Sequence, residues 1–239
     1  MKLHPVSLLA FLALAVSAFA QTKATATPKA RATVPAYAKV DDVPGLPRVL
    51  LLGDSISIGY HVAVRERLAG KANVHRPAEN CGDSTRGVKS LEKWLGSGKW
   101  DIIHFNFGLH DLKYLDAAGQ LAPPEKGKQV TSLTEYEANL RTIVAGLRPT
   151  GAKLIFATTT PVPDKSAGRI ENDEVRYNAV AVRVMRELGV AIDDLHAFVK
   201  PRQAQAQRPN NVHFSTEGSA QLADAVVATI IPVLPKPTR

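Results

Sequence analysis

The chain has 239 residues, 45% of them hydrophobic and 22% charged, and its formal net charge of +8 raises the question of nucleic-acid binding. Seven basic residues lie in residues 2–39 and 236–239 without an acidic residue, which leaves one of the eight net positive charges to residues 41–235. A nucleic-acid-binding domain concentrates its basic residues on the folded surface, so this distribution argues against nucleic acid as a partner.

The first 40 residues divide into two segments. Residues 1–20 have the pattern of a secretory signal peptide, with Lys2 ahead of an apolar run over 6–16 and the sequence Ala18-Phe19-Ala20 before Gln21. The run is shorter than the roughly 20 apolar residues of a membrane span, so we expect cleavage after Ala20, export to the periplasm or cell exterior, and no transmembrane segment in the mature chain. Residues 21–40 are rich in Thr, Ala, Lys and Pro, which predicts a disordered linker. Residues 41–235 then form a single domain.

Strand and helix patterns alternate through residues 41–235. Short apolar runs predict strands over 48–52, 101–107, 153–158 and 190–193, and a short, weakly marked strand is expected over 73–76. Helical spacing predicts helices over 58–68, 85–94, 135–147, 172–188 and 216–231. Thr134 is the expected cap of the third helix, with Glu137 at capping-box spacing. Residues 111–131 are expected to be irregular.

This alternation predicts an α/β fold, with a parallel sheet covered by helices on both faces. The loops that follow parallel strands share one edge of the sheet, so Ser55 and the loops at 80–84, 108–111 and 159–164 should converge there. Taken alone, Ser55 suits a helix N-cap as well as it suits a nucleophile.

Other polar and aromatic residues have simpler interpretations. The single cysteine, Cys81, cannot form an intramolecular disulfide and is expected to be buried. His104 lies within an apolar strand, and Trp94 and Trp100 suit core packing better than a sugar-binding surface. No metal-ligand spacing, phosphate loop or dinucleotide motif occurs in the sequence, so we expect no metal and no cofactor.

Four blocks of sequence resemble those of the SGNH, or GDSL-type, hydrolase superfamily. The first is intact as Gly53-Asp54-Ser55, and the second matches through Gly82. The third, at 108–111, has His110 where the family has Asn. The resulting Gly-Leu-His-Asp motif resembles that of one bacterial subgroup of the superfamily. The fourth, at 210–213, has Asn210 where the family has Asp. The resemblance spans about 48–232 and implies a flavodoxin-like three-layer α/β/α sandwich with a five-stranded parallel sheet.

The resemblance also implies a serine mechanism with an acyl-enzyme. Ser55 would be the nucleophile and His213 its general base. The backbone N–H groups of Ser55 and Gly82 and the side chain of His110 would form the oxyanion hole. A neutral imidazole carries one N–H and can therefore act as an oxyanion donor. A protonated His110 would donate more strongly, which would favour a mildly acidic pH optimum of activity.

The family's Asp would stabilise the imidazolium of His213, whereas Asn210 is neutral. Three possibilities follow: a Ser–His dyad, a different acid such as Asp193 or Asp194, or the loss of catalysis. Asp54 and Asp111 are expected to support the site through hydrogen bonds rather than to act as acids.

The predicted function is hydrolysis of a small-molecule or carbohydrate ester, with O-acetyl groups on sugars favoured. The alternatives are a catalytically impaired protein that binds ligands with the same fold, and a lipase or thioesterase of that fold.

Overall fold

The computed structural model of the protein describes Met1 and residues 34–235. The predicted signal peptide beyond Met1 and most of the predicted linker lie outside this part of the chain. A short 3₁₀ helix lies at Pro35–Tyr37, and Ala36 within it is buried. Within the described residues, no helix is both long enough and apolar enough to cross a membrane.

Five parallel strands form the central sheet, as predicted. They are β1 (Arg48–Leu52), β2 (Asn73–His75), β3 (Ile102–Phe105), β6 (Lys153–Ala157) and β7 (Ala191–Asp193). Their order is β2-β1-β3-β6-β7, with Leu51 paired to His104 and His104 paired to Ile155. This is the flavodoxin-like order, in which the direction of winding reverses between β1 and β3.

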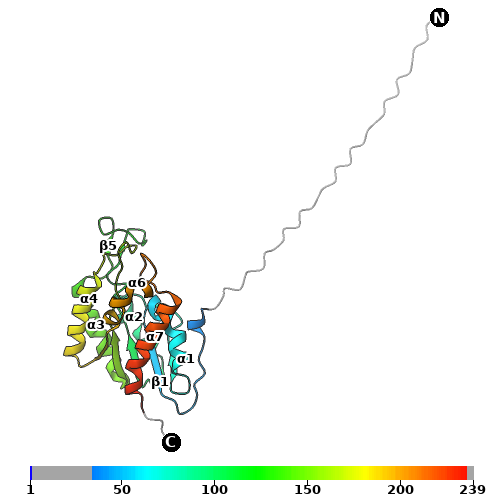
Figure 1. The fold of residues 1–239 in the computed structure, drawn as a ribbon, viewed down its shortest axis with the longest axis vertical. Coiled ribbons are helices and arrows are strands. Elements are labelled where there is room, and N and C mark those ends of the chain that lie inside the picture. Colours follow the sequence, from blue (N-terminus) through cyan, green and yellow to red (C-terminus); the bar gives the residue numbers. More distant parts are fainter. Residues whose placement is uncertain (2–33, 236–239) are drawn as a thin grey trace. The chain divides into compact units, whose positions relative to one another are not determined.

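Helices cover both faces of the sheet, so the three-layer α/β/α fold is confirmed (Figure 1). The helices are α1 (Ser55–Arg67), α2 (Ser84–Leu95), α3 (Leu133–Leu147), α4 (Glu174–Glu187), α5 (Leu195–Val199), α6 (Gln203–Ala206) and α7 (Thr216–Ile230). Helix α1 packs against α7, whereas α3 packs against both α2 and α4.

The core lies on both sides of the sheet. Residues 49–52 of β1 are at most 1% exposed, and large aromatic side chains such as Tyr60, Tyr136 and Phe105 fill the space under the helices. Each such side chain contributes roughly 1.5–3 kcal/mol by burial. Cys81 is buried and unpaired, as expected, and burial raises the pKa of its thiol to about 11.

Several element boundaries differ from the prediction. Helix α1 begins at Ser55, three residues early, and α3 is capped by Ser132 with Glu135 completing the capping box, not by Thr134 with Glu137. Residues 111–131 contain a small antiparallel pair, β4 (Tyr114–Leu115) and β5 (Lys128–Gln129). The short helices α5 and α6 were not predicted, because four or five residues carry too little periodicity to detect.

The reversal between β1 and β3 determines where a ligand can bind. The loops after these two central strands leave toward opposite sides, which opens a crevice beyond their carboxyl ends. Ser55 follows β1, and the 108–111 segment follows β3, so the fold brings the first and third sequence blocks to this crevice.

Candidate active site

Ser55 is the first residue of α1, and it does not cap the helix. The N-cap is Asp54, whose side chain accepts a hydrogen bond from the Ile56 N–H at 2.8 Å. The Ser55 hydroxyl is therefore free of a capping role, and the residue is partly exposed. Asp54 stabilises the turn, as the sequence predicted. Gly53 is needed there because a Cβ would lie 2.7 Å from that of Ser57.

His213 lies within hydrogen-bond distance of Ser55. Its Nε2 is 2.9 Å from the Ser55 Oγ, although the two residues are 158 positions apart. The segment before α7 holds the histidine in place: the Arg208 N–H donates to the His213 carbonyl at 2.9 Å, and Gln207 pairs with Phe214 in an isolated bridge.

The neighbour of the His213 ring is Asn211, not Asn210. The Asn211 Oδ1 lies 2.8 Å from the ring Nδ1 and 3.0 Å from the His213 backbone nitrogen. A backbone N–H can only donate, so the side-chain atom facing it must be the amide oxygen, and the ring Nδ1 must carry a proton. The Nε2 lone pair is then available to accept the Ser55 hydroxyl proton.

We predicted that Asn210 would contact the His213 ring, but the adjacent residue, Asn211, makes that contact. Asn210 is exposed and has a φ of +54°, which turns the chain so that the next residue faces the histidine. The two proposed substitute acids bond elsewhere. Asp193 contacts the His104 Nε2 at 2.9 Å, and Asp194 caps α5 through the Ala197 N–H. His104 is thus the buried, partnered histidine that was expected.

The electrostatic surroundings keep His213 neutral. Burial lowers the pKa of this imidazole, the positive charges of Arg169 and Arg208 lower it further, and the Asp54 carboxylate opposes them. The net shift is downward, so the ring is unprotonated near neutral pH, as a general base must be.

The second block lies against the first. The Cys81 N–H donates to the Gly53 carbonyl at 3.3 Å, which places Gly82 beside the Ser55 turn. Gly82 has a φ of +68°, a conformation that favours glycine. Its N–H donates to the Asn80 Oδ1 at 2.9 Å, so this predicted oxyanion donor already has an acceptor.

Sequence reasoning missed Arg76, which joins these two blocks. Its guanidinium donates to the carbonyls of Gly53 and Glu79 and to the Ser57 hydroxyl, each at 3.2 Å. Its position directly after β2, at the carboxyl edge of the sheet, was the one available signal.

The third block supplies His110, whose Nδ1 lies 3.1 Å from the Lys113 Nζ. Burial is the main cause that lowers the pKa of His110. The expected advantage of a protonated His110 is therefore not supported: the ring is neutral near pH 7. Asp111 is fully buried and accepts hydrogen bonds from the Ser84 N–H and hydroxyl, which anchors the start of α2. Burial raises the pKa of Asp111 to about 6.

The segment after β6 closes over the third block. The Arg169 guanidinium donates twice to the Leu109 carbonyl, at 3.2 and 3.3 Å. Gly108 has a φ of +145°, and a Cβ there would lie 2.1 Å from the Thr159 Oγ1. The four sequence blocks therefore meet at one edge of the sheet, as predicted.

A groove of about 560 Å³ opens from Ser55 and His213 between α1 and α7. Its walls combine apolar side chains, such as Val62 and Phe214, with the charged Glu66 and Arg208. A volume of this size suits a small ligand. In the described part of the chain, no group of three or more His, Cys, Asp or Glu side chains is arranged to hold a metal ion.

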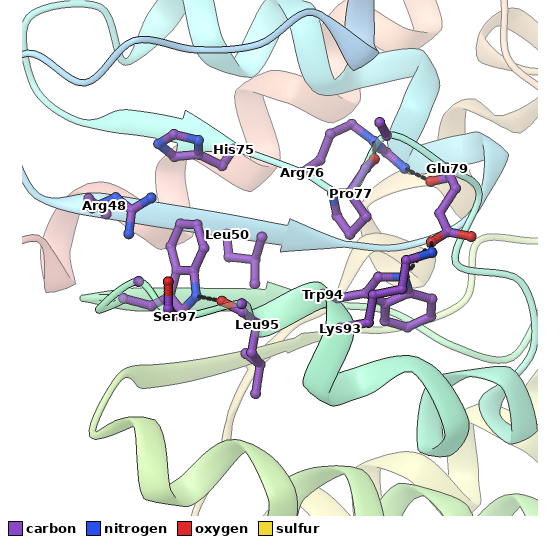
Figure 2. Close-up of a pocket in the computed structure, with 14 residues that line it drawn as sticks. Arg48, Leu50, His75, Arg76, Pro77, Glu79, Lys93, Trp94, Leu95 and Ser97 are labelled. Atoms are coloured by element: carbon purple, nitrogen blue, oxygen red, sulfur yellow. Dashed lines mark hydrogen bonds and ion pairs between the residues drawn. The ribbon is translucent and has the colours of Figure 1, made fainter.

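A second groove of about 560 Å³ lies between β2 and α2 (Figure 2), and neither Ser55 nor His213 lines it. Trp94 and Trp100 line it but are only 6% and 9% exposed, in keeping with core packing. The indole N–H of Trp94 donates to Glu79, and that of Trp100 donates to the Leu95 carbonyl. Both indole N–H groups that line the groove therefore already have acceptors.

The model of the GDSL-like lipase/acylhydrolase family matches residues 51–221, which include all four blocks. The chain belongs to this family. It is accordingly a carboxylic ester hydrolase, and the resemblance found in the sequence is confirmed. No curated protein matches this GDSL-like hydrolase.

Solved structures share the fold of the GDSL-like hydrolase at low sequence identity. A lipase/acylhydrolase from Enterococcus faecalis has a TM-score of 0.63 at 20% identity, covering 81% of this chain and 100% of its own. The acetyl xylan esterase AlAXEase has a TM-score of 0.62 at 15% identity, with coverage of 77% and 99%. Axe2, an acetylxylan esterase from Geobacillus stearothermophilus, has a TM-score of 0.60 at 20% identity, with coverage of 77% and 94%.

Proposed function

We propose that the protein is a serine esterase in which Ser55 is the nucleophile and His213 the general base. The observation that carries this proposal is the 2.9 Å contact between the Ser55 Oγ and the His213 Nε2. The Ser55 oxygen forms a bond to the ester carbonyl carbon while its proton passes to Nε2. The alcohol then leaves with that proton, and a water activated by the same histidine hydrolyses the acyl-enzyme.

The negative charge of the tetrahedral intermediate would be stabilised by the backbone N–H groups of Ser55 and Gly82 and by the His110 ring. Losing one such donor typically costs about 10²–10³ in rate. Gly82 would share its N–H between the oxyanion and the Asn80 Oδ1, or release it from Asn80 when substrate binds.

The proposed substrate is an O-acyl ester, with O-acetyl groups on carbohydrate preferred. The groove beside Ser55 suits a small acyl group with a sugar-sized alcohol, and two of the structural neighbours are named as acetyl xylan esterases. The signal-peptide pattern of residues 1–20 supports export.

Labelling with a serine-reactive fluorophosphonate tests the mechanism without a choice of substrate. We expect the native protein and Ser57→Ala to be labelled and to hydrolyse p-nitrophenyl acetate, and Ser55→Ala to do neither. Equal hydrolysis by the native protein and Ser55→Ala would exclude the serine mechanism.

A protein that binds ligands without catalysis is the second candidate, because His213 faces an amide where an acid would assist it. Failure of the native protein to react with the probe, together with binding of acetylated xylo-oligosaccharide in calorimetry, would favour that candidate.

A further inference from the structure

The contact between Lys113 and His110 determines where the imidazole proton lies. The Lys113 Nζ is 3.1 Å from the His110 Nδ1. An ammonium group has three donors and no acceptor, so Nδ1 must accept. The single proton of the neutral ring is therefore on Nε2. An imidazole left to itself can carry the proton on either nitrogen, and only one choice leaves Nε2 a donor.

The backbone fixes both partners. The Leu112 N–H donates to the Gly108 carbonyl at 3.0 Å, and the Val130 N–H donates to the Lys113 carbonyl at 2.9 Å. Lys113 is partly buried, and in the part of the chain that the structure describes it makes no ion pair with a carboxylate. Burial lowers the pKa of the Lys113 ammonium, and the carboxylates of Asp83 and Asp111 oppose that shift without forming an ion pair with it.

We propose that Lys113 is a positioning residue that holds His110 in the Nε2–H tautomer, so that the ring presents a donor to the oxyanion in every turnover. This inference rests on the proposed role of His110 in the oxyanion hole. It assigns Lys113 no contact with the substrate.

Charged groups from four loop segments act electrostatically on His110. Asp54 before α1 and Asp83 before α2 raise the pKa of the imidazole, whereas Lys113 and Arg169 lower it. Burial is the largest cause, and the net shift is downward. The ring therefore works in its neutral form, in which the choice of tautomer matters. An imidazolium would have a donor on both nitrogens.

Nitrogen-15 NMR of the histidine rings tests the tautomer without reference to activity. Protonated and unprotonated ring nitrogens have well-separated shifts, so long-range proton–nitrogen spectra at pH 8 identify the proton-bearing atom of His110. We expect Nε2 alone in the native protein and a mixture of tautomers in Lys113→Met. The proposal is wrong if the native ring carries its proton on Nδ1, or if Lys113→Met leaves the tautomer unchanged.

The kinetic test uses Lys113→Met in two backgrounds. In the native background we expect kcat at pH 8 to fall about tenfold with little change in KM, a part of the cost of losing an oxyanion donor. The loss should shrink toward pH 6, because the freed ring can then take a second proton and regain its Nε2 donor.

In the His110→Asn background the same substitution should change kcat less than twofold, because an amide N–H needs no choice of tautomer. An equal loss in both backgrounds would overturn the proposal and leave Lys113 a structural role. If Ser55→Ala retained full activity, the proposed function would fail, yet the NMR result on the tautomer would still stand.

Discussion

At the scale of single residues, the partner of the proposed base is an amide. The side-chain amide oxygen of Asn211 lies 2.8 Å from the His213 Nδ1, and this contact orients the ring and selects its tautomer. The amide adds no negative charge, so in the proposed mechanism the imidazolium formed when Ser55 gives up its proton would be stabilised less than by a carboxylate. Orientation and charge stabilisation, which one acid would combine, are separated in this site.

This separation predicts a gain of function. Asn211→Asp should raise kcat for p-nitrophenyl acetate at pH 8 by roughly tenfold, because the new carboxylate stabilises the imidazolium in the transition state. It should also raise the pKa of His213, which moves the acidic limb of the pH–rate profile to higher pH.

The matched control is Asn210→Asp, which places the same charge on the adjacent residue. Among the described residues, the ring Nδ1 contacts the Asn211 side chain and not that of Asn210, so this variant should leave kcat within about twofold. Equal gains from both variants would indicate a general charge effect, and no gain from Asn211→Asp would show that imidazolium stabilisation does not limit the rate.

Sequence motifs identify the residues whose neighbours along the chain belong to the motif. Ser55 and His213 follow from their blocks, and the 2.9 Å contact agrees with that assignment. Asn211 does not, because the left-handed turn at Asn210 decides which of two adjacent amides faces the ring. Arg76 joins two loops, and its place directly after a strand was its only signal in the sequence. Lys113 acts on the proton of the His110 side chain, which leaves no pattern in the sequence.

At the scale of elements, the central strands β1 and β3 were predictable because each is a nearly continuous apolar run buried on both faces. The edge strands β2 and β7 are shorter and less apolar. Helix starts were less predictable. The stretch at 132–137 contains two Ser/Thr-x-x-Glu patterns, Ser132 with Glu135 and Thr134 with Glu137. Leu133 packs against the core, so the helix must include it, and the earlier pair becomes the capping box.

The choice between these two caps is measurable. Ser132→Ala should lower the free energy of unfolding by about 1 kcal/mol, since it removes the hydroxyl that accepts from the Glu135 N–H. Thr134→Ala lies inside the first turn and should change it by no more than a few tenths of a kcal/mol. Urea unfolding at pH 7 compares them, and a larger loss in Thr134→Ala would contradict the observed cap.

At the scale of the whole molecule, two buried groups make stability depend on pH in opposite directions. Burial lowers the pKa of His61 to about 3, so between that value and about 6.5 the unfolded chain binds a proton that the folded protein does not. Stability from this group is lost as pH falls. The raised pKa of Asp111, about 6, has the reverse sign: between about 3.9 and 6 the folded protein binds the extra proton, and stability is lost as pH rises.

Removing His61 should therefore flatten the acid side of the stability profile. The native protein should lose about 2 kcal/mol between pH 8 and pH 5 through this histidine alone, at about 1.4 kcal/mol for each pH unit below 6.5. His61→Gln keeps an acceptor for Arg65, whose guanidinium lies 2.7 Å from the ring Nε2, and His61→Leu removes it. Each variant will have its own stability at pH 8, but both should lose about 2 kcal/mol less than the native protein on acidification, because the Asp111 contribution is common to all three and cancels. Urea unfolding at both pH values measures these differences. An unchanged pH dependence in both variants would mean that His61 protonates in the folded state, and that some other buried group makes the domain sensitive to acid.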